Sequence, residues 1–261
     1  MKTNPPFAAL TTPLSGGRQQ KHWDARAALN FMLGGTGSGL IIALAVAGAE
    51  SPIPVILALA LIAAGLGAVW LEIGRKLRAL HVLFNPFTSW MTREAFVAVL
   101  LFPLGLGAVF VPSALPAAAV AAAAFLYCQA RILRAAKGIP AWRAPQVVPL
   151  ILATGLAEGA GLALFFSQAT VLIALFAIAV GFRALAGWRY RAAVTAAVPA
   201  LSGVTMAILV LVAAGLYVQE ALLLAGIAAV ASGWWLKLAL VTRAAPAQGF
   251  TLPRVPVRGA R

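Results

Sequence analysis

The chain has 261 residues, of which 62% are hydrophobic and 10% charged, and its formal net charge is +14. A soluble domain is typically about half apolar and about a quarter charged, so this composition excludes an ordinary soluble protein and favours a membrane protein. The single cysteine, Cys128, excludes an internal disulfide and an iron–sulfur cluster held by this chain alone.

Apolar stretches follow one another along most of the chain, and each approaches the roughly 20 residues that span a bilayer as a helix. We expect an all-α fold with about eight transmembrane helices, at 27–48, 53–72, 94–111, 114–133, 147–166, 169–186, 194–218 and 220–242. The expected organisation is an N-terminal tail over 1–26, a transmembrane bundle over 27–242 and a C-terminal tail over 243–261.

The basic residues are confined to alternate connections between the expected helices. Lys and Arg lie in both tails and in the three longer connections, and the short connections carry none. This count assigns Arg183 and Lys237 to helix ends. Because Lys and Arg accumulate on the cytoplasmic side of membrane proteins, we expect both termini and the longer connections in the cytoplasm. Topology therefore explains the positive charge without nucleic acid, and the same face is suited to an acidic protein partner.

Glycine pairs inside the spans predict close helix packing. Gly35 and Gly39 form a Gly-x-x-x-Gly pair in the first expected helix, and Gly155 and Gly159 form another in the fifth. The run from 34 to 39 lacks the lysine and the preceding strand of a phosphate-binding loop. We interpret it as a packing surface.

Three carboxylates are candidates for chemistry. Glu158 lies about 17 Å into the fifth expected helix, where an intramembrane carboxylate is either functional or a protonated group that hydrogen-bonds a neighbouring helix. Glu72 and Glu94 flank a polar segment that contains His81. This segment either binds a polar headgroup and moves protons, or is an ordinary interfacial loop.

The remaining polar and aromatic residues exclude some cofactors. Neither histidine, His22 or His81, lies inside an expected span, so a haem held by two histidines within the membrane is excluded. No Cys/His spacing typical of a metal site is present in the sequence. Four tryptophans are interpreted as anchors at the membrane interface, namely Trp142, Trp188, Trp234 and Trp235.

Two segments resemble the NrfD/PsrC/DmsC-like family. The run Glu72-Ile-Gly-Arg-Lys-Leu-Arg78, followed by Asn85-Pro-Phe-Thr-Ser-Trp-Met-Thr-Arg-Glu94, is similar to the loop between that family's second and third helices. Trp23 and Asn30-Phe-Met-Leu-Gly-Gly-Thr-Gly-Ser-Gly39 resemble its first helix. These proteins are haem-free membrane anchors of molybdenum or tungsten iron–sulfur oxidoreductases. The resemblance covers residues 23–94, and beyond them it rests on the helix count.

The resemblance implies a quinone site under the second connection, formed by Asn30, Arg78, His81 and Glu94. Glu94 and Glu72 would move protons there, and we add Glu158 as a third catalytic candidate. Glu72 takes the place of a histidine in DmsC-type members, and Lys76 takes the place of a proline, so the role of Glu72 departs from the family pattern. The residues expected to dock a partner are Arg75, Asn85, Ser89, Trp90 and Arg93.

The implied partners are a ferredoxin-like iron–sulfur subunit and a molybdenum or tungsten catalytic subunit that holds molybdopterin. The implied substrate is ubiquinone or menaquinone, and this chain itself would hold neither haem nor iron–sulfur clusters. The sequence around Trp23 and Trp90 resembles that of membrane subunits of phenylacetyl-CoA:acceptor oxidoreductases. The expected location is a bacterial or archaeal cytoplasmic (inner) membrane. Two alternatives remain open, a secondary transporter that uses Glu158 and a structural anchor without a redox pocket.

Overall fold

The computed structural model describes residues 23–72, 81–193 and 202–245. All regular secondary structure in these ranges is helical, which confirms the all-α expectation for this part of the chain. The helices are α1 (Ala25–Ala47), α2 (Pro52–Glu72), α3 (Trp90–Phe110), η3 (Pro112–Ala114), α4 (Leu115–Ala135), α5 (Pro140–Arg143), α6 (Val147–Ala163), α7 (Thr170–Ala193), α8 (Ser202–Ala214) and α9 (Gln219–Thr242).

Six helices are long and apolar enough to cross a membrane: α1, α2, α3, α4 with η3, α7 and α9. The described parts of α6 and α8 are apolar but shorter, at Val147–Ala163 and Gly203–Ala214. Because a span takes about 20 residues, these lengths support a multi-pass membrane protein with at least six spans. Each of the eight expected ranges overlaps one of these helices, and eight spans stays a prediction.

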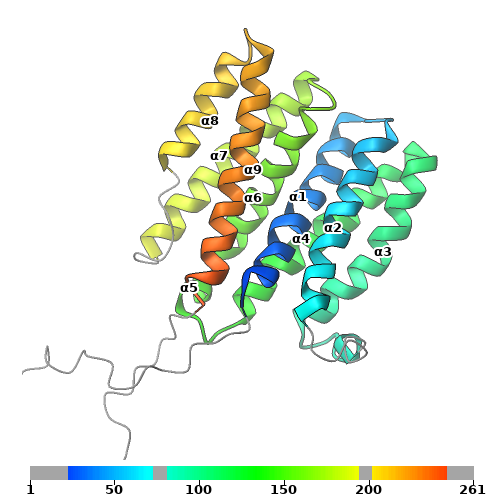
Figure 1. Cartoon of the computed structure of the whole chain (residues 1–261), viewed down its shortest axis with the longest axis vertical. Helices are drawn as coiled ribbons and strands as arrows, with labels where there is room; N and C mark the ends of the chain where they lie inside the picture. Colours follow the sequence, from blue (N-terminus) through cyan, green and yellow to red (C-terminus); the bar gives the residue numbers. More distant parts are fainter. Residues whose placement is uncertain (1–22, 73–80, 194–201, 246–261) are drawn as a thin grey trace, which may run out of the picture.

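Successive long helices run antiparallel, so the first and last described residues lie at the same end of the bundle (Figure 1). α1 is the most buried of the six long helices and packs against α2, α4, α6 and α9. α6 lies beside it and also contacts α4, α7 and α9. The core of the protein is therefore built around α1 and α6.

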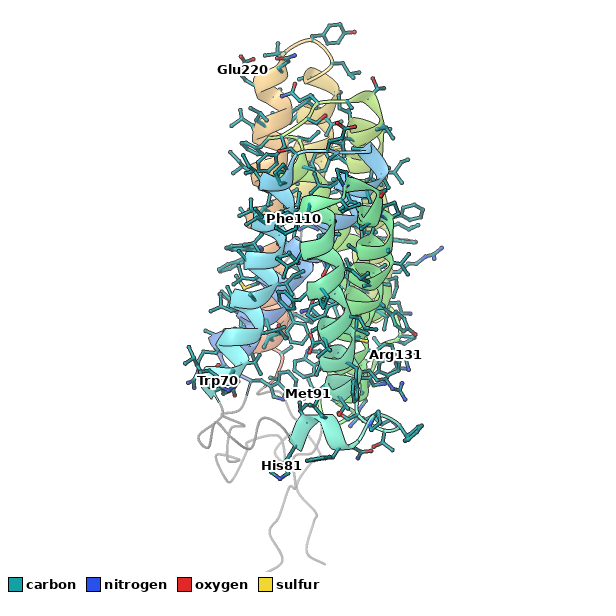
Figure 2. The ribbon with its side chains drawn as sticks, turned by 90° about the vertical axis from the view of Figure 1, so that its right-hand side faces the viewer. Trp70, His81, Met91, Phe110, Arg131 and Glu220 are labelled. Atoms are coloured by element: carbon teal, nitrogen blue, oxygen red, sulfur yellow. The ribbon has the colours of Figure 1, made fainter. Side chains whose placement is uncertain are left out.

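One end of the bundle carries most of the described basic residues, and we call it the basic end. It is formed by the start of α1, α3 and α6 and the end of α2, α4, α7 and α9. Figure 2 shows His81, Met91 and Arg131 there and Glu220 at the opposite end. The described basic residues of the basic end are Arg26, Arg93, Arg131, Arg134, Lys137, Arg143, Arg189, Arg191 and Arg243.

Two of the helices that begin at the basic end, α1 and α3, have N-terminal caps formed by side chains. Asp24 accepts hydrogen bonds from the backbone N–H groups of Arg26 and Ala27 at the start of α1. The hydrogen-bonded Arg26 guanidinium beside it holds the pKa of the Asp24 carboxyl below its ordinary value. Ser89 caps α3 in the same way by accepting from the Thr92 N–H at 3.3 Å. These caps fix where α1 and α3 begin.

Glycines bring α1 and α6 into backbone contact. A methyl group on Gly39 would lie 2.0 Å from the Gly155 carbonyl oxygen, and one on Gly159 would lie 2.0 Å from the Gly39 carbonyl carbon. A methyl group on Gly155 would lie 3.2 Å from the Gly35 carbonyl oxygen. No side chain fits at this crossing, so the packing role predicted for the two glycine pairs is confirmed.

We expect Gly159→Ala to destabilise the bundle by about 1–3 kcal/mol, because the added methyl group overpacks the crossing with α1. Gly107→Ala is the matched control, since a methyl group on Gly107 meets nothing within 4 Å. Thermal unfolding of both variants in detergent, followed by circular dichroism, measures the difference. A Gly159→Ala midpoint equal to that of the wild type would contradict the described crossing.

Candidate functional site

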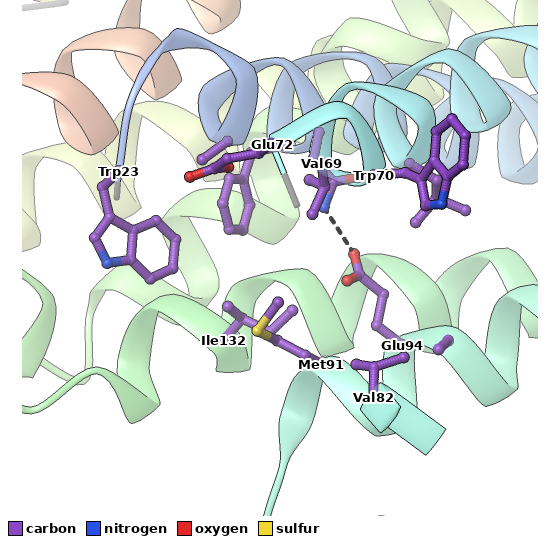
Figure 3. A pocket seen from close by; sticks show the side chains of 13 residues that line it. Trp23, Val69, Trp70, Glu72, Val82, Met91, Glu94 and Ile132 are labelled. Carbon is purple, nitrogen blue, oxygen red and sulfur yellow. Dashed lines mark hydrogen bonds between the residues drawn. The ribbon is translucent and has the colours of Figure 1, made fainter. Parts of the chain in front are cut away.

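A pocket of about 510 Å³ lies at the basic end, between α1, α2 and α3 (Figure 3). α1 and α3 begin here and α2 ends here, so residues far apart in sequence share one wall. The lining is apolar and aromatic except for Asn30, Glu72 and Glu94. The lining residues are Trp23, Ala27, Asn30, Phe31, Leu66, Val69, Trp70, Glu72, Val82, Met91, Glu94, Ala95 and Ile132.

The polar groups of the pocket form a buried hydrogen-bonded pair and a separate carboxylate. The Asn30 side-chain amide donates to Glu94 Oε1 at 3.2 Å, and both side chains are buried. Gln129 of α4 donates from Nε2 to the Asn30 carbonyl oxygen at 2.9 Å and thereby supports the pair from behind. Glu72 lies across the pocket, toward Trp23 (Figure 3). The structure thus brings three of the predicted site residues together.

This arrangement suits a flat apolar molecule that carries polar groups at its edge. The Trp23, Phe31 and Trp70 rings offer aromatic contact, and Glu94 offers an oxygen that accepts or, when protonated, donates a hydrogen bond. Asn30 Oδ1 is buried and has no hydrogen-bond partner among the described residues.

Of the remaining predicted quinone-site residues, the structure describes His81 and not Arg78. His81 is exposed, contacts the Phe84 ring at 5.5 Å between centroids, and does not line the pocket. Arg78 lies outside the described residues, as does Arg75 of the predicted docking set. Among the described residues 81–89, Val82 lines the pocket, and its carbonyl oxygen accepts a hydrogen bond from the Thr92 hydroxyl group.

The predicted docking residues hold the segment before α3 in place. Arg93 donates to the carbonyl oxygens of Pro86 and Phe87, at 2.8 and 2.6 Å. The Trp90 ring has the Arg93 and Arg131 guanidinium groups within 4.2 and 4.3 Å of its centroid. These cation–π contacts stabilise the segment and gather positive charge beside it.

Two further members of the docking set complete this surface. Asn85 is exposed, and its carbonyl oxygen accepts from the Ser89 N–H at 3.1 Å. The same segment presents two phenylalanines to the outside, with Phe84 77% and Phe87 86% exposed. Partner docking by these residues stays a prediction.

A second polar cluster lies deep in the bundle, centred on Glu158 of α6. Lys237 of α9 donates to Glu158 Oε2 at 2.6 Å, and both side chains are fully buried. The Thr36 hydroxyl group lies 2.8 Å from the same oxygen, and the Trp234 indole donates to Thr36 at 2.9 Å. Glu158 is therefore held as one half of an ion pair that joins α1, α6 and α9.

A second cation belongs to this cluster. Arg183 of α7 is buried and donates to the Ala229 carbonyl oxygen at 3.1 Å and to the Ser232 hydroxyl group at 3.0 Å. The assignment of Arg183 and Lys237 to helix ends as topological charges is therefore wrong, because both side chains turn into the bundle. Sequence reasoning also missed Gln129. For Lys237 a signal existed, since apolar residues flank it on both sides within one helix.

The interface role predicted for the tryptophans is wrong for Trp142. This side chain is fully buried, donates to the Leu240 carbonyl oxygen at 3.0 Å and packs edge-on against Trp23. Trp234 also turns inward, to Thr36. Trp188 and Trp235 are exposed, as an interface anchor requires.

No protein-family model matches the sequence, and no curated protein matches it either. The resemblance to the NrfD/PsrC/DmsC-like family therefore rests on the two quoted segments alone.

We expect Lys237→Met to lower the free energy of unfolding by about 3–5 kcal/mol, because it removes the cation that is hydrogen-bonded to the buried Glu158 carboxylate, and the described hydrogen bonds of Arg183 go to Ala229 and Ser232 instead. The double variant Glu158→Gln with Lys237→Met removes both charges and is expected to recover most of this loss. Thermal unfolding in detergent measures both. A double variant no more stable than Lys237→Met would contradict the ion pair.

Proposed function

We propose that this chain is the haem-free membrane anchor and quinone-reactive subunit of a multi-subunit molybdenum or tungsten iron–sulfur oxidoreductase. The observation that carries the proposal is the pocket at the basic end, where the buried Asn30–Glu94 pair meets an apolar and aromatic wall. Quinones combine a flat apolar ring, a lipid-soluble tail and two carbonyl oxygens. Such a molecule needs both kinds of surface.

Quinone reduction takes up two protons for two electrons, so a quinone site requires groups that move protons. Glu94 and Glu72 line the same pocket from α3 and α2. In the proposed mechanism Glu94 exchanges a proton with one quinone oxygen, and Asn30 donates a hydrogen bond that keeps Glu94 oriented. Glu72 is the last residue of α2, and in the proposed mechanism it exchanges protons between the pocket and water.

The proposed electron donor or acceptor is a ferredoxin-like iron–sulfur subunit at the basic end, with the molybdenum or tungsten subunit behind it. Support comes from the exposed Phe84 and Phe87, which lie in the segment before α3, close in sequence to Trp90 and the two guanidinium groups over its ring. Interfaces commonly combine exposed aromatic groups with arginine. A cytoplasmic basic end and a phenylacetyl-CoA substrate for the complex belong to this proposal.

We expect Glu94→Gln to lower quinone-linked turnover of the purified complex by about 100-fold, because general acid–base groups typically contribute factors of that order. Quenching of tryptophan fluorescence by decylubiquinone measures binding in parallel, through Trp23 and Trp70 of the pocket wall. Glu220→Gln, at the opposite end of the bundle, is the matched control. Full turnover in Glu94→Gln would count heavily against the proposed site.

We expect the double variant Phe84→Ser with Phe87→Ser to reduce co-purification of the iron–sulfur subunit at least about tenfold, since buried aromatic anchors often contribute 2 kcal/mol or more. Tyr217→Ser is the control, because Tyr217 is 90% exposed between α8 and α9 at the other end. The iron content of the tagged chain after purification in mild detergent is the readout. Undiminished iron would place the docking surface elsewhere.

A second candidate, a secondary transporter coupled through Glu158, is favoured by the fully buried Glu158–Lys237 ion pair. Ionisable residues inside a membrane commonly mark ion pathways. Proton flux into liposomes that contain only this chain separates the two candidates. Flux that is abolished in Glu158→Gln would favour the transporter, and a chain that carries none without partner subunits would favour the anchor.

A further inference from the structure

Polar groups follow α1 from the pocket to the buried ion pair. The Asn30 amide bonds Glu94, the Asn30 carbonyl oxygen accepts from Gln129, and the Thr36 hydroxyl group bonds Glu158. From Asn30 to Thr36 the helix rises by about 9 Å. Apart from one gap, these contacts connect the two clusters described above.

The gap lies over Gly35 and separates Gln129 from Lys237. A methyl group on Gly35 would lie 2.3 Å from Lys237 Nζ and 3.8 Å from Gln129 Oε1, so these two polar atoms are at most 6.1 Å apart. Two hydrogen bonds of ordinary length span about 6 Å, which one water molecule or a small rotation of the lysine side chain covers. Gly35 keeps this space open because it has no side chain.

The groups on both sides of the gap are complementary. Gln129 Oε1 is a buried acceptor without a hydrogen-bond partner among the described residues. The Lys237 ammonium group has three donors, and its one described bond goes to Glu158. On the pocket side, Gln129 donates to the Asn30 carbonyl oxygen, and the Asn30 side chain donates to Glu94. An unpaired acceptor therefore faces a cation that has donors to spare.

The charges around the ion pair favour a mobile proton on Lys237. The described ionisable groups that face it are Glu158 from α6 and Arg183 from α7, while α1 and α4 contribute the neutral Thr36 and Gln129. With all three charged, this buried cluster has a net charge of +1. Loss of one proton from Lys237 makes it neutral, with Arg183 left to balance Glu158, and burial favours the neutral state.

We propose that Lys237 is a proton store for the pocket and exchanges a proton with Glu94 along a path positioned by Gln129. In the transfer an N–H bond of the Lys237 ammonium breaks and its electron pair stays on nitrogen, while an O–H bond forms on the Glu94 carboxylate. The reverse step reloads the store. The physiological role of this exchange rests on the proposed function, in which Glu94 passes the proton to a quinone oxygen.

Hydrogen exchange of the Lys237 ammonium tests this path without any quinone. The full chain, labelled with ¹³C,¹⁵N-lysine, contains five lysines, and the Lys237 signal is assigned from its absence in Lys237→Met. After transfer to D₂O in nanodiscs, deuterium replaces the Lys237 protons through the pocket. We expect Gln129→Met to slow this replacement by about tenfold or more, because one hydrogen-bonded step is lost.

Two further variants complete the experiment. Gln129→Glu restores a polar group and is expected to return the exchange rate to near the wild-type value. Thr154→Val removes a buried hydroxyl group whose one hydrogen bond among the described residues goes to the Leu150 carbonyl oxygen of its own helix, and is expected to leave the rate unchanged.

An unchanged rate in Gln129→Met would overturn the proposal, because the proton would then leave by another route. Should that variant not fold, Glu94→Gln gives the same test, since it removes the group that receives the proton, and an unchanged rate again overturns the path. Quinone binding is measured separately with decylubiquinone. Failure of the proposed function and failure of the proton path between Lys237 and Glu94 are therefore distinguishable.

Discussion

Charged side chains inside an apolar bundle have to be paired within the protein, and this requirement organises the structure around α1. The Glu158–Lys237 ion pair is fully buried, and α6 and α9 approach α1 closely enough for Thr36 to join it. Glycines on α1 and α6 permit that approach. The pairing of buried charges and the close packing of helices therefore both depend on α1.

The same helix connects the buried charges with the pocket at the basic end. Asn30 lies about 1.7 turns before Thr36 and bonds Glu94, so the pocket carboxylate is held from α1 in the way that Glu158 is. The aromatic wall around the Asn30–Glu94 pair suits a lipid-soluble ring with polar edges. In the proposed function, α1 is the fixed element against which ligand chemistry takes place, and the surrounding helices supply the titratable groups.

The positions of the helices and part of the pocket were predicted from the sequence, because hydropathy indicates the length and burial of each span. Sequence reasoning placed Asn30, Glu72 and Glu94 at one site on the strength of a resemblance, and the structure lines one pocket with all three. It misassigned Lys237 and Arg183, since it counted both as charges at helix ends, although apolar residues flank Lys237 on both sides within α9. Gln129 was missed because a neutral amide in an apolar span gives no sign of its role in the sequence. Its contact with Asn30 is created by the fold.

In the proposed function, a quinone binds between α1, α2 and α3 at the basic end. Photolabelling of the purified chain with an azido-quinone, followed by mass spectrometry of its peptides, tests this binding. We expect labelled residues within Trp23–Phe31, Leu66–Glu72 and Val82–Ala95, with labelling suppressed by excess decylubiquinone. Labelling confined to α7, α8 or α9, or labelling that excess quinone leaves unchanged, would contradict it.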